Sequence, residues 1–232
     1  MQVGKSFTYA FEDKEWLSKI LIGALIFIVP ILNIAWGGYT TEIIRRVSRN
    51  DPVPLSGWDD FGKKFVDGLI LFIAALIYSL PIIILSLILI PVFVLPATAQ
   101  QGNTQSALAA VSTGVGVVLG CLIFLYGLLL SLLIPAVQIN FARHGSFGSC
   151  FQLGNIIKLA TSNLGNYIVA WLAYIVVGFV VGLVVSGIST ILAVIPCIGW
   201  ILALIISAIA TPYTLFVYSH LFGQVGAQAP AS

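Results

Sequence analysis

The adjacent carboxylates Asp59 and Asp60 are the part of this sequence that most resembles an acid–base pair. Paired carboxylates can donate and accept protons at a reacting group. Lys63 and Lys64 follow them, however, and acidic residues in a first helical turn complement the helix dipole. The pair is therefore predicted to stabilise the start of a helix. The sequence has no serine-nucleophile elbow, His-Glu-x-x-His helix or phosphate-binding loop, so we expect no catalytic residue and no enzymatic activity.

Histidine and cysteine are the remaining residue types that could bind a metal or a haem. His220 lies near the end of the last apolar run, and no second histidine stands at helical spacing from it. His220 is therefore a weak candidate for a cofactor ligand, because a lone histidine at a helix end is more often an interface residue. Cys121, Cys150 and Cys197 have no paired spacing, and Cys121 is predicted to be a small buried apolar residue. We predict no metal site and no bound cofactor.

The composition places these residues in a membrane protein. Of the 232 residues, 59% are hydrophobic and only 8% are charged, whereas soluble domains have about 25% charged residues. All acidic residues lie between Glu12 and Asp67, and the only charges after Asp67 are Arg143 and Lys158. Membrane lipid is therefore the expected partner, together with other membrane proteins or further copies of the chain, and no nucleic acid is expected.

Long apolar segments separated by short polar ones predict the elements that position the charged residues. We predict an all-α polytopic integral membrane helical bundle with about five spans and additional interfacial amphipathic helices. A single membrane domain is expected over residues 1–222, followed by a disordered tail over 223–232. Its predicted elements are an interfacial helix at 1–19, a span at 17–39, a charged cytoplasmic loop with a short helix at 40–64, spans at 65–96 and 113–135, an interfacial helix at 146–161, and spans at 166–195 and 200–221.

The first apolar segment, residues 17–39, has two possible paths. Its length suits a membrane crossing, but Pro30, Asn33 and the Gly37–Gly38 pair interrupt it. We predict that it crosses, and the alternative is a re-entrant segment that dips into the bilayer and returns. The re-entrant path would place every Lys and Arg of the chain on one face.

A cluster of cations defines the orientation. Loops rich in Lys and Arg face the cytoplasm, which predicts a cytoplasmic location for the charged loop and the C-terminus. The cluster is also a candidate site for anionic lipid headgroups, although charge that only orients the chain would look the same in the sequence. It consists of Arg45, Arg46, Arg49, Lys63 and Lys64.

Interfacial helices each followed by two spans suggest a weak internal repeat over residues 54–135 and 146–222. Because two spans separate the interfacial helices, the repeat would be parallel.

Small residues recur four positions apart on two predicted spans. Such stripes let helix backbones approach closely, so they are expected to pack helices within the chain or to dock another membrane protein. The candidate packing or partner residues are Gly116, Gly120, Gly178, Gly182 and Ser186.

Several short motifs resemble one prokaryotic membrane family. They comprise aromatic and acidic residues before the first apolar segment, a Gly-Tyr pair followed by two arginines, and a Pro-Leu-x-x-Trp-Asp-Asp-x-Gly block with a later phenylalanine and glycine. In this chain they are Phe11, Asp13, Trp16, Gly38, Tyr39, Arg45, Arg46, Pro54, Leu55, Trp58, Asp59, Asp60, Gly62, Phe65 and Gly68. The chain resembles the family called domain of unknown function 4013, in which Leu-Pro usually stands closer to the tryptophan. The resemblance implies a bacterial or archaeal plasma-membrane protein of several helices and implies no activity.

We therefore predict a non-enzymatic accessory or scaffold subunit that packs against a larger membrane complex or organises lipid. The chain has no Asp or Glu after Asp67, which argues against proton- or sodium-coupled transport. The alternative is a channel or uncoupled transporter for a small or lipophilic solute. Its path would be lined by Asn33, Ser79, Ser86, Gln138 and Asn140. An enzyme acting on lipid would need a nucleophile or metal site that the sequence lacks.

Overall fold

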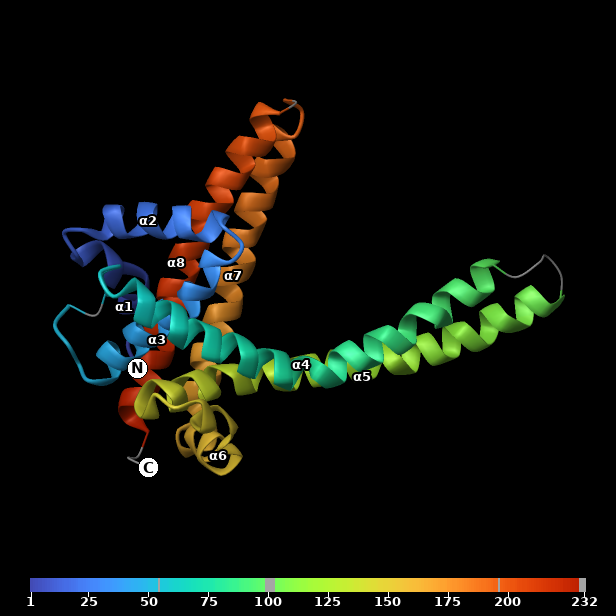
Figure 1. Ribbon diagram of the computed structural model, residues 1–232, viewed down its shortest axis with the longest axis horizontal. Coiled ribbons are helices and arrows are strands. Elements are labelled where there is room, and N and C mark those ends of the chain that lie inside the picture. The colour runs from blue at the N-terminus through green and yellow to red at the C-terminus, as the bar shows by residue number, and fades with distance from the viewer. Residues whose placement is uncertain (54, 99–102, 196, 230–232) are drawn as a thin grey trace. The chain divides into compact units, whose positions relative to one another are not determined.

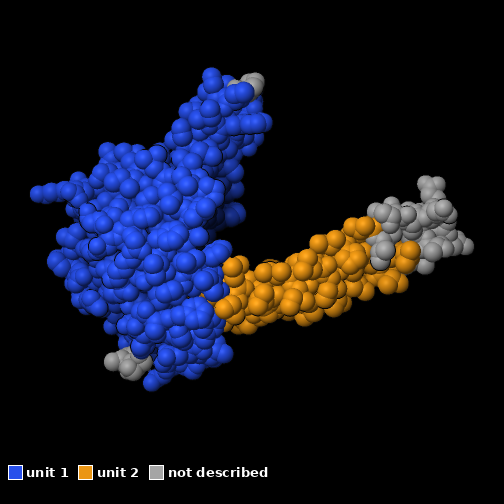
Figure 2. Space-filling model, viewed as in Figure 1, with its two compact units in different colours: residues 1–73, 135–232 blue, residues 74–134 orange. Residues whose placement is uncertain are grey.

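The computed structural model describes residues 1–53, 55–98, 103–195 and 197–229, and these form helices and connecting turns without a β-strand. This confirms the all-α prediction. The elements in chain order are α1 (Val3–Thr8), η1 (Tyr9–Glu12), α2 (Trp16–Ile28), η2 (Leu32–Ile34), α3 (Ala35–Ser48), α4 (Phe61–Thr98), α5 (Asn103–His144), η3 (Phe147–Phe151), α6 (Leu153–Ser162), α7 (Leu164–Leu192) and α8 (Ile198–Gln228) (Figure 1). The chain divides into two compact units, residues 1–73 with 135–232 and residues 74–134 (Figure 2).

Four helices among the described residues, α4, α5, α7 and α8, are long and apolar enough to cross a membrane. In the most apolar window of each, only 6% to 22% of the residues are buried inside the protein. Their remaining apolar side chains face outward, where only lipid tails can cover them without a cost. The chain is therefore a helical integral membrane protein, with four such helices where the sequence suggested about five.

The difference lies in the first apolar segment. Helix α2 ends at Ile28 and α3 begins at Ala35, so residues 17–39 do not form one continuous helix. With 13 residues, α2 is about 20 Å long at 1.5 Å per residue, which is shorter than the roughly 30 Å hydrocarbon layer. Pro30 lies in the break and disfavours helical geometry in the residue before it.

The N-terminal segment also differs from the single interfacial helix predicted over residues 1–19. It is divided into α1, η1 and a turn that leads into α2. In this turn the Asp13 carboxylate accepts a hydrogen bond from the Glu15 N–H at 2.8 Å, and Lys19 Nζ lies 2.6 Å from the other Asp13 oxygen. Asp13 thus stabilises the turn in place of a continuing helix.

The charged loop is shorter than expected. Helix α3 continues to Ser48, and Asn50 follows with φ 58°, a left-handed conformation that asparagine tolerates at helix ends. The predicted short helix does not form by itself. Asp59 and Asp60 instead precede α4, which runs without interruption from Phe61 to Thr98.

Two helices are longer than their hydropathy predicts. Helix α5 begins at Asn103 and continues through Pro135 to His144, and residues 99–102 lie outside the described part of the chain. Helix α8 continues to Gln228, so the prediction of a disordered tail is wrong for residues 223–228. Gly223 and Gly226 are buried there, and a Cβ atom at Gly223 would overlap Val47 of α3.

Helix α3 lies in the core of the first unit. Its residues Ala35, Tyr39, Ile43 and Ile44 are fully buried. The start of α4 crosses α3 at glycines, because a Cβ atom at Gly38 would overlap the Lys64 carbonyl oxygen of α4, and one at Gly68 would overlap the Ile34 carbonyl oxygen immediately before α3. This crossing explains why two glycines of the family block are needed at these positions.

The long helices form two hairpins, one in each unit, and each is described by itself. In the second unit, Tyr126 of α5 donates a hydrogen bond to the Tyr78 carbonyl of α4 at 2.9 Å. In the first unit, α7 and α8 pack as an antiparallel pair, with the rings of Tyr174 and Tyr218 centred 4.9 Å apart. The predicted repeat of such pairs stays a prediction.

Candidate functional site

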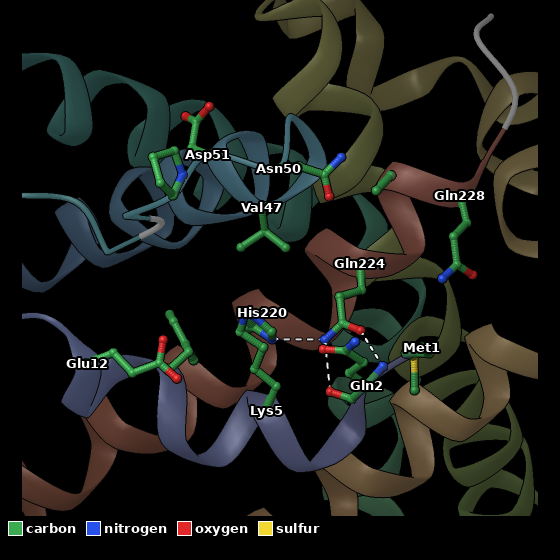
Figure 3. Close-up of a pocket in the computed structure, with 13 residues that line it drawn as sticks. Met1, Gln2, Lys5, Glu12, Val47, Asn50, Asp51, His220, Gln224 and Gln228 are labelled. Atoms are coloured by element: carbon green, nitrogen blue, oxygen red, sulfur yellow. Dashed lines mark hydrogen bonds between the residues drawn. The ribbon is translucent and has the colours of Figure 1, made fainter.

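His220, the candidate cofactor ligand, is held by hydrogen bonds inside the protein. Its Nδ1 atom lies 2.8 Å from Ser6 Oγ. It also lies 2.9 Å from Gln224 Nε2, a contact that Figure 3 shows. Its ring stacks on Tyr9 with centroids 4.2 Å apart. Among the described residues no group of three or more His, Cys, Asp and Glu side chains is placed to hold a metal ion. The geometry gives His220 a role in joining α1 to α8.

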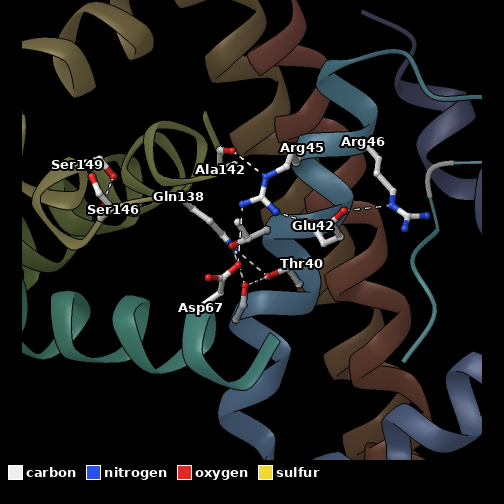
Figure 4. Close-up of polar contacts among 11 residues, drawn as sticks. Thr40, Glu42, Arg45, Arg46, Asp67, Gln138, Ala142, Ser146 and Ser149 are labelled. Carbon is white, nitrogen blue, oxygen red and sulfur yellow. Dashed lines mark hydrogen bonds and ion pairs between the residues drawn. The ribbon is translucent and has the colours of Figure 1, made fainter. Parts of the chain in front are cut away.

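The predicted lipid-binding cations do not form one surface. Arg45 pairs with Glu42 and lies 3.9 Å from Asp67, and its Nε atom donates to the Ala142 carbonyl at 2.9 Å (Figure 4). Arg46 donates to the other Glu42 oxygen at 3.3 Å. Arg45 therefore joins α3 to α4 and α5, and Arg46 bonds within α3 and to the Leu55 carbonyl of the following loop at 3.5 Å, in addition to any role at a lipid surface.

The two lysines of the cluster differ in exposure. Lys64 is only 6% exposed because α4 passes next to Gly38 at that point, whereas Lys63 is exposed. Glu42 shows how closely the charges interact: burial alone would raise the pKa of its carboxyl, but Arg45 and Arg46 lower that pKa overall. Glu42 is therefore ionised at neutral pH.

A second cation-rich feature is an open cavity of about 400 Å³ at the ends of α3, α5 and α8, which we call the arginine cavity. Among the described residues, three arginines and one histidine line it and no carboxylate does. The lining residues are Arg45, Ser48, Arg49, Ala142, Arg143, His144, Gly226 and Ala229. Arg143 and His144 are the members that the predicted cluster lacked.

Close packing of α3 against α8 brings these cations together. Ser48 Oγ donates to the Gly223 carbonyl at 3.0 Å, and Gly226 leaves no room for a side chain beside Ser48. On the α5 side, Arg143 donates to the carbonyls of Gly226 and Ala229 at 2.7 and 3.0 Å. The guanidinium of Arg143 is thus held in place before any ligand arrives, which lowers the entropic cost of binding.

Two of the residues proposed for a transport path, Gln138 and Asn140, have hydrogen-bond partners inside the protein. The Gln138 amide donates to Thr40 Oγ1 at 2.7 Å and Thr41 Oγ1 at 3.1 Å, and its oxygen accepts from Tyr218 at 2.7 Å (Figure 4). Asn140 donates to the Ser149 carbonyl at 2.8 Å. Buried polar groups of this kind stabilise helix packing, and Ser79 and Ser86 lie in the other unit.

Of the glycines predicted to pack helices, only Gly116 has a side chain of another helix within reach of a Cβ atom among the described residues. A Cβ atom at Gly120, Gly178 or Gly182 would meet nothing within 4 Å, and one at Gly116 would meet only the Phe93 ring. Ser186 donates to Leu183 of its own helix. The glycines that allow close approach of helices are elsewhere, at the contacts of α3 with α4 and α8.

Trp58 is a structural residue whose partner the sequence did not indicate. Its indole N–H donates to the Lys19 carbonyl of α2 at 3.0 Å, and its ring stacks on Tyr39 at 4.3 Å. Tyr39 in turn donates to the Ser56 carbonyl at 2.7 Å. The tryptophan of the Trp-Asp-Asp block thus fastens the charged loop to α2 and α3, while Asp59 and Asp60 stay exposed.

The fold and these sites define a helical integral membrane protein with a cation-lined cavity at the ends of its helices. The family model described as a protein of unknown function, DUF4013, matches residues 21–190. The chain belongs to this family, as the motif around Trp58 indicated. No curated protein and no solved structure matches the chain.

Proposed function

We propose that this protein is a non-enzymatic membrane protein that organises anionic lipid at the cytoplasmic face of a prokaryotic plasma membrane. The observation that carries the proposal is the arginine cavity, whose described lining has cations and no carboxylate. It lies at the ends of the apolar helices α5 and α8, and the proposal puts these helix ends among the lipid headgroups.

A lipid phosphate is the anion that fits this position best. Guanidinium groups bind phosphate oxygens through paired hydrogen bonds, and Arg143 is already oriented by α8 carbonyls. Arg49 is exposed at the end of α3 and can turn toward a headgroup. Each cation near an anionic surface contributes about 1 kcal/mol to lipid binding.

The contacts of the first unit also support a re-entrant path for the first apolar segment. Before the segment, Gln2 and Ser6 bond to Gln224 and His220 near the end of α8. After it, Ser48 of α3 bonds to Gly223 of the same helix. The parts of the chain that flank the segment thus lie at the same end of α8, so we infer four spans with both termini on the cytoplasmic face.

A second candidate function is that of an accessory subunit that packs against a larger membrane complex. The specific observation is that Gly178 and Gly182 form an open part of α7 with no packing partner among the described residues. Glycine costs about 1 kcal/mol in a helix, and close contact with a second membrane helix would offset this cost.

The lipid proposal is tested by titrating the purified protein in detergent with dioctanoyl phosphatidylglycerol and dioctanoyl phosphatidylcholine, with bound lipid counted by native mass spectrometry. Because one cation contributes about 1 kcal/mol to the binding of an anionic lipid, we expect Arg49→Gln to weaken phosphatidylglycerol binding about fivefold. The matched control is Lys63→Gln, an exposed cation outside the cavity.

Lys63→Gln should leave the affinity for phosphatidylglycerol within about twofold of that of the unmodified protein, because an exposed charge outside the site contributes little to binding. The proposal fails if both lipids bind equally, or if Arg49→Gln and Lys63→Gln have the same effect. The second of these results would assign the lipid preference to general charge on the surface.

A further inference from the structure

A second, larger cavity of about 650 Å³ lies between α1, the end of α3 and the end of α8, and we call it the N-terminal cavity (Figure 3). It shares no lining residue with the arginine cavity. Its described lining combines one lysine, two carboxylates, four side-chain amides and one histidine. These polar residues are Gln2, Lys5, Glu12, Asn50, Asp51, His220, Gln224 and Gln228.

The contacts around His220 favour one of its two neutral tautomers. The Gln224 oxygen accepts from the Gln2 N–H at 2.6 Å, and its nitrogen donates to the Gln2 carbonyl at 3.2 Å and to Ser6 Oγ at 3.1 Å. The same nitrogen lies 2.9 Å from His220 Nδ1. Because an amide nitrogen can only donate, a hydrogen bond at this contact requires Nδ1 to accept, which favours the neutral ring with its proton on Nε2.

This tautomer leaves an N–H donor without a protein partner. His220 is only 5% exposed, and no hydrogen bond to Nε2 occurs among the described residues. Nε2 is not one of the described buried polar atoms that lack a partner, so it reaches open space, where an acceptor atom of a ligand can take its hydrogen bond. Lys5, which lines the cavity beside His220, adds a positive charge to the same acceptor (Figure 3).

The carboxylates occupy a different part of the lining. Figure 3 shows Glu12 and Asp51 on one side of the cavity and Gln2, Gln224 and Gln228 on the other, with Lys5 and His220 between them. A ligand that fits this arrangement has an anionic group for Lys5 and His220 and a cationic group for the carboxylates. A ligand with a single charged group would match only one of these two parts of the lining.

We propose that the N-terminal cavity binds a phosphoethanolamine group, with its phosphate on Lys5 and His220 and its primary ammonium on Glu12 and Asp51. The cavity lies at the end of α8, where a lipid headgroup and a water-soluble molecule can both reach it. The ammonium has N–H groups that donate to carboxylates, which the quaternary ammonium of a choline headgroup lacks. The proposal is independent of anionic lipid binding at the arginine cavity.

The test uses the full-length protein in detergent, titrated with dioctanoyl phosphatidylethanolamine and dioctanoyl phosphatidylcholine and read out by native mass spectrometry. We expect phosphatidylethanolamine to bind at least about tenfold more tightly, the gain of one charge-assisted hydrogen bond. Glu12→Gln should reduce this preference. Lys5→Gln should lower the affinity for both lipids, because both contain phosphate.

Matched controls are Glu15→Gln and Lys14→Gln, which change exposed residues outside the cavity. His220→Asn keeps an acceptor near the Nδ1 position and removes the Nε2 donor, so it should act like Lys5→Gln. Equal binding of the two lipids, or equal effects of Glu12→Gln and Glu15→Gln, overturns the proposal. An unchanged affinity of Arg49→Gln for phosphatidylglycerol would overturn only the function proposed for the arginine cavity.

Glycerophosphoethanolamine identifies the source of the ligand. If it competes with the lipid, the headgroup alone is recognised and a soluble molecule can fill the site. If it does not compete while the lipid preference holds, the acyl chains contribute and the ligand is a lipid. The proposal holds with either source, and it fails when neither molecule shows a preference over its choline counterpart.

Discussion

At the scale of single residues, Asp13 shows how one carboxylate determines a local path. Burial alone would raise the pKa of the Asp13 carboxyl, but hydrogen bonds from Lys19 and the Glu15 N–H lower that pKa below its ordinary value. The ionised form is therefore favoured by folding. Its contribution to stability is present above the unfolded-state pKa, about 3.9, and is lost as the pH falls through the lower folded-state value.

We therefore expect Asp13→Asn to reduce the free energy of unfolding at pH 7 by about 1–2 kcal/mol, because Lys19 loses its nearest partner. The difference from the unmodified protein should shrink as the pH falls below about 4. Unfolding by sodium dodecyl sulfate in mixed micelles at several pH values measures it. Glu15→Gln, whose carboxylate is exposed and 3.9 Å from Lys19, should have little effect, and an equal loss in both variants would contradict the assignment.

The residues of the candidate sites were predictable in part. The sequence indicated Arg45 and Arg49, because they stand in a charged loop beside an apolar segment. It did not indicate Arg143, which lies far along the chain and reaches them through the contacts of α5 and α8 with α3. Lys64 was included wrongly as an exposed cation, because the sequence does not show that α4 crosses α3 at Gly38.

At the scale of the elements, the glycine crossing of α3 and α4 tests the packing most directly. A Cβ atom at Gly38 would overlap the Lys64 carbonyl, so one of the backbones must move. Gly38→Ala is therefore expected to lower the free energy of unfolding by about 1–3 kcal/mol, measured by detergent-induced unfolding.

Gly62 of α4, the other helix of this crossing, provides the control, since a Cβ atom there would meet nothing within 4 Å. Gly62→Ala should be neutral or should stabilise α4 by up to about 1 kcal/mol, because alanine is the better helix former. Equal destabilisation by both substitutions would mean that the α3–α4 contact does not determine the stability.

Hydropathy predicted that the helices exist but not where they end. The apolar runs of α4, α5, α7 and α8 are evident in the sequence because their outward faces need no polar residues. The ends are set by packing instead: α8 continues to Gln228 because Gly223 and Gly226 fit against α3. Likewise, the break after Ile28 depends on Trp36 and Trp58, whose indole N–H groups bond to Gly23 and Lys19 of α2.

At the scale of the whole molecule, the number of spans determines where each terminus lies. A crossing first segment gives five spans and an external N-terminus, whereas a re-entrant segment gives four spans and two cytoplasmic termini. Hydropathy alone could not separate these paths, since both bury the same apolar residues. The bonds that join Ser6 to His220 and Ser48 to Gly223 favour the re-entrant path.

The central claim is that both cavities lie at the cytoplasmic headgroup level, and single-cysteine labelling of intact cells tests it most directly. With the native cysteines replaced by serine, we would introduce Glu12→Cys, Ala227→Cys and Val194→Cys, all at exposed positions, the last between α7 and α8. A membrane-impermeant maleimide should label Val194→Cys in intact cells and the other two only after lysis. Labelling of Glu12→Cys in intact cells would place the N-terminus outside the cell. Residues 17–39 would then cross the membrane, and the account would be contradicted.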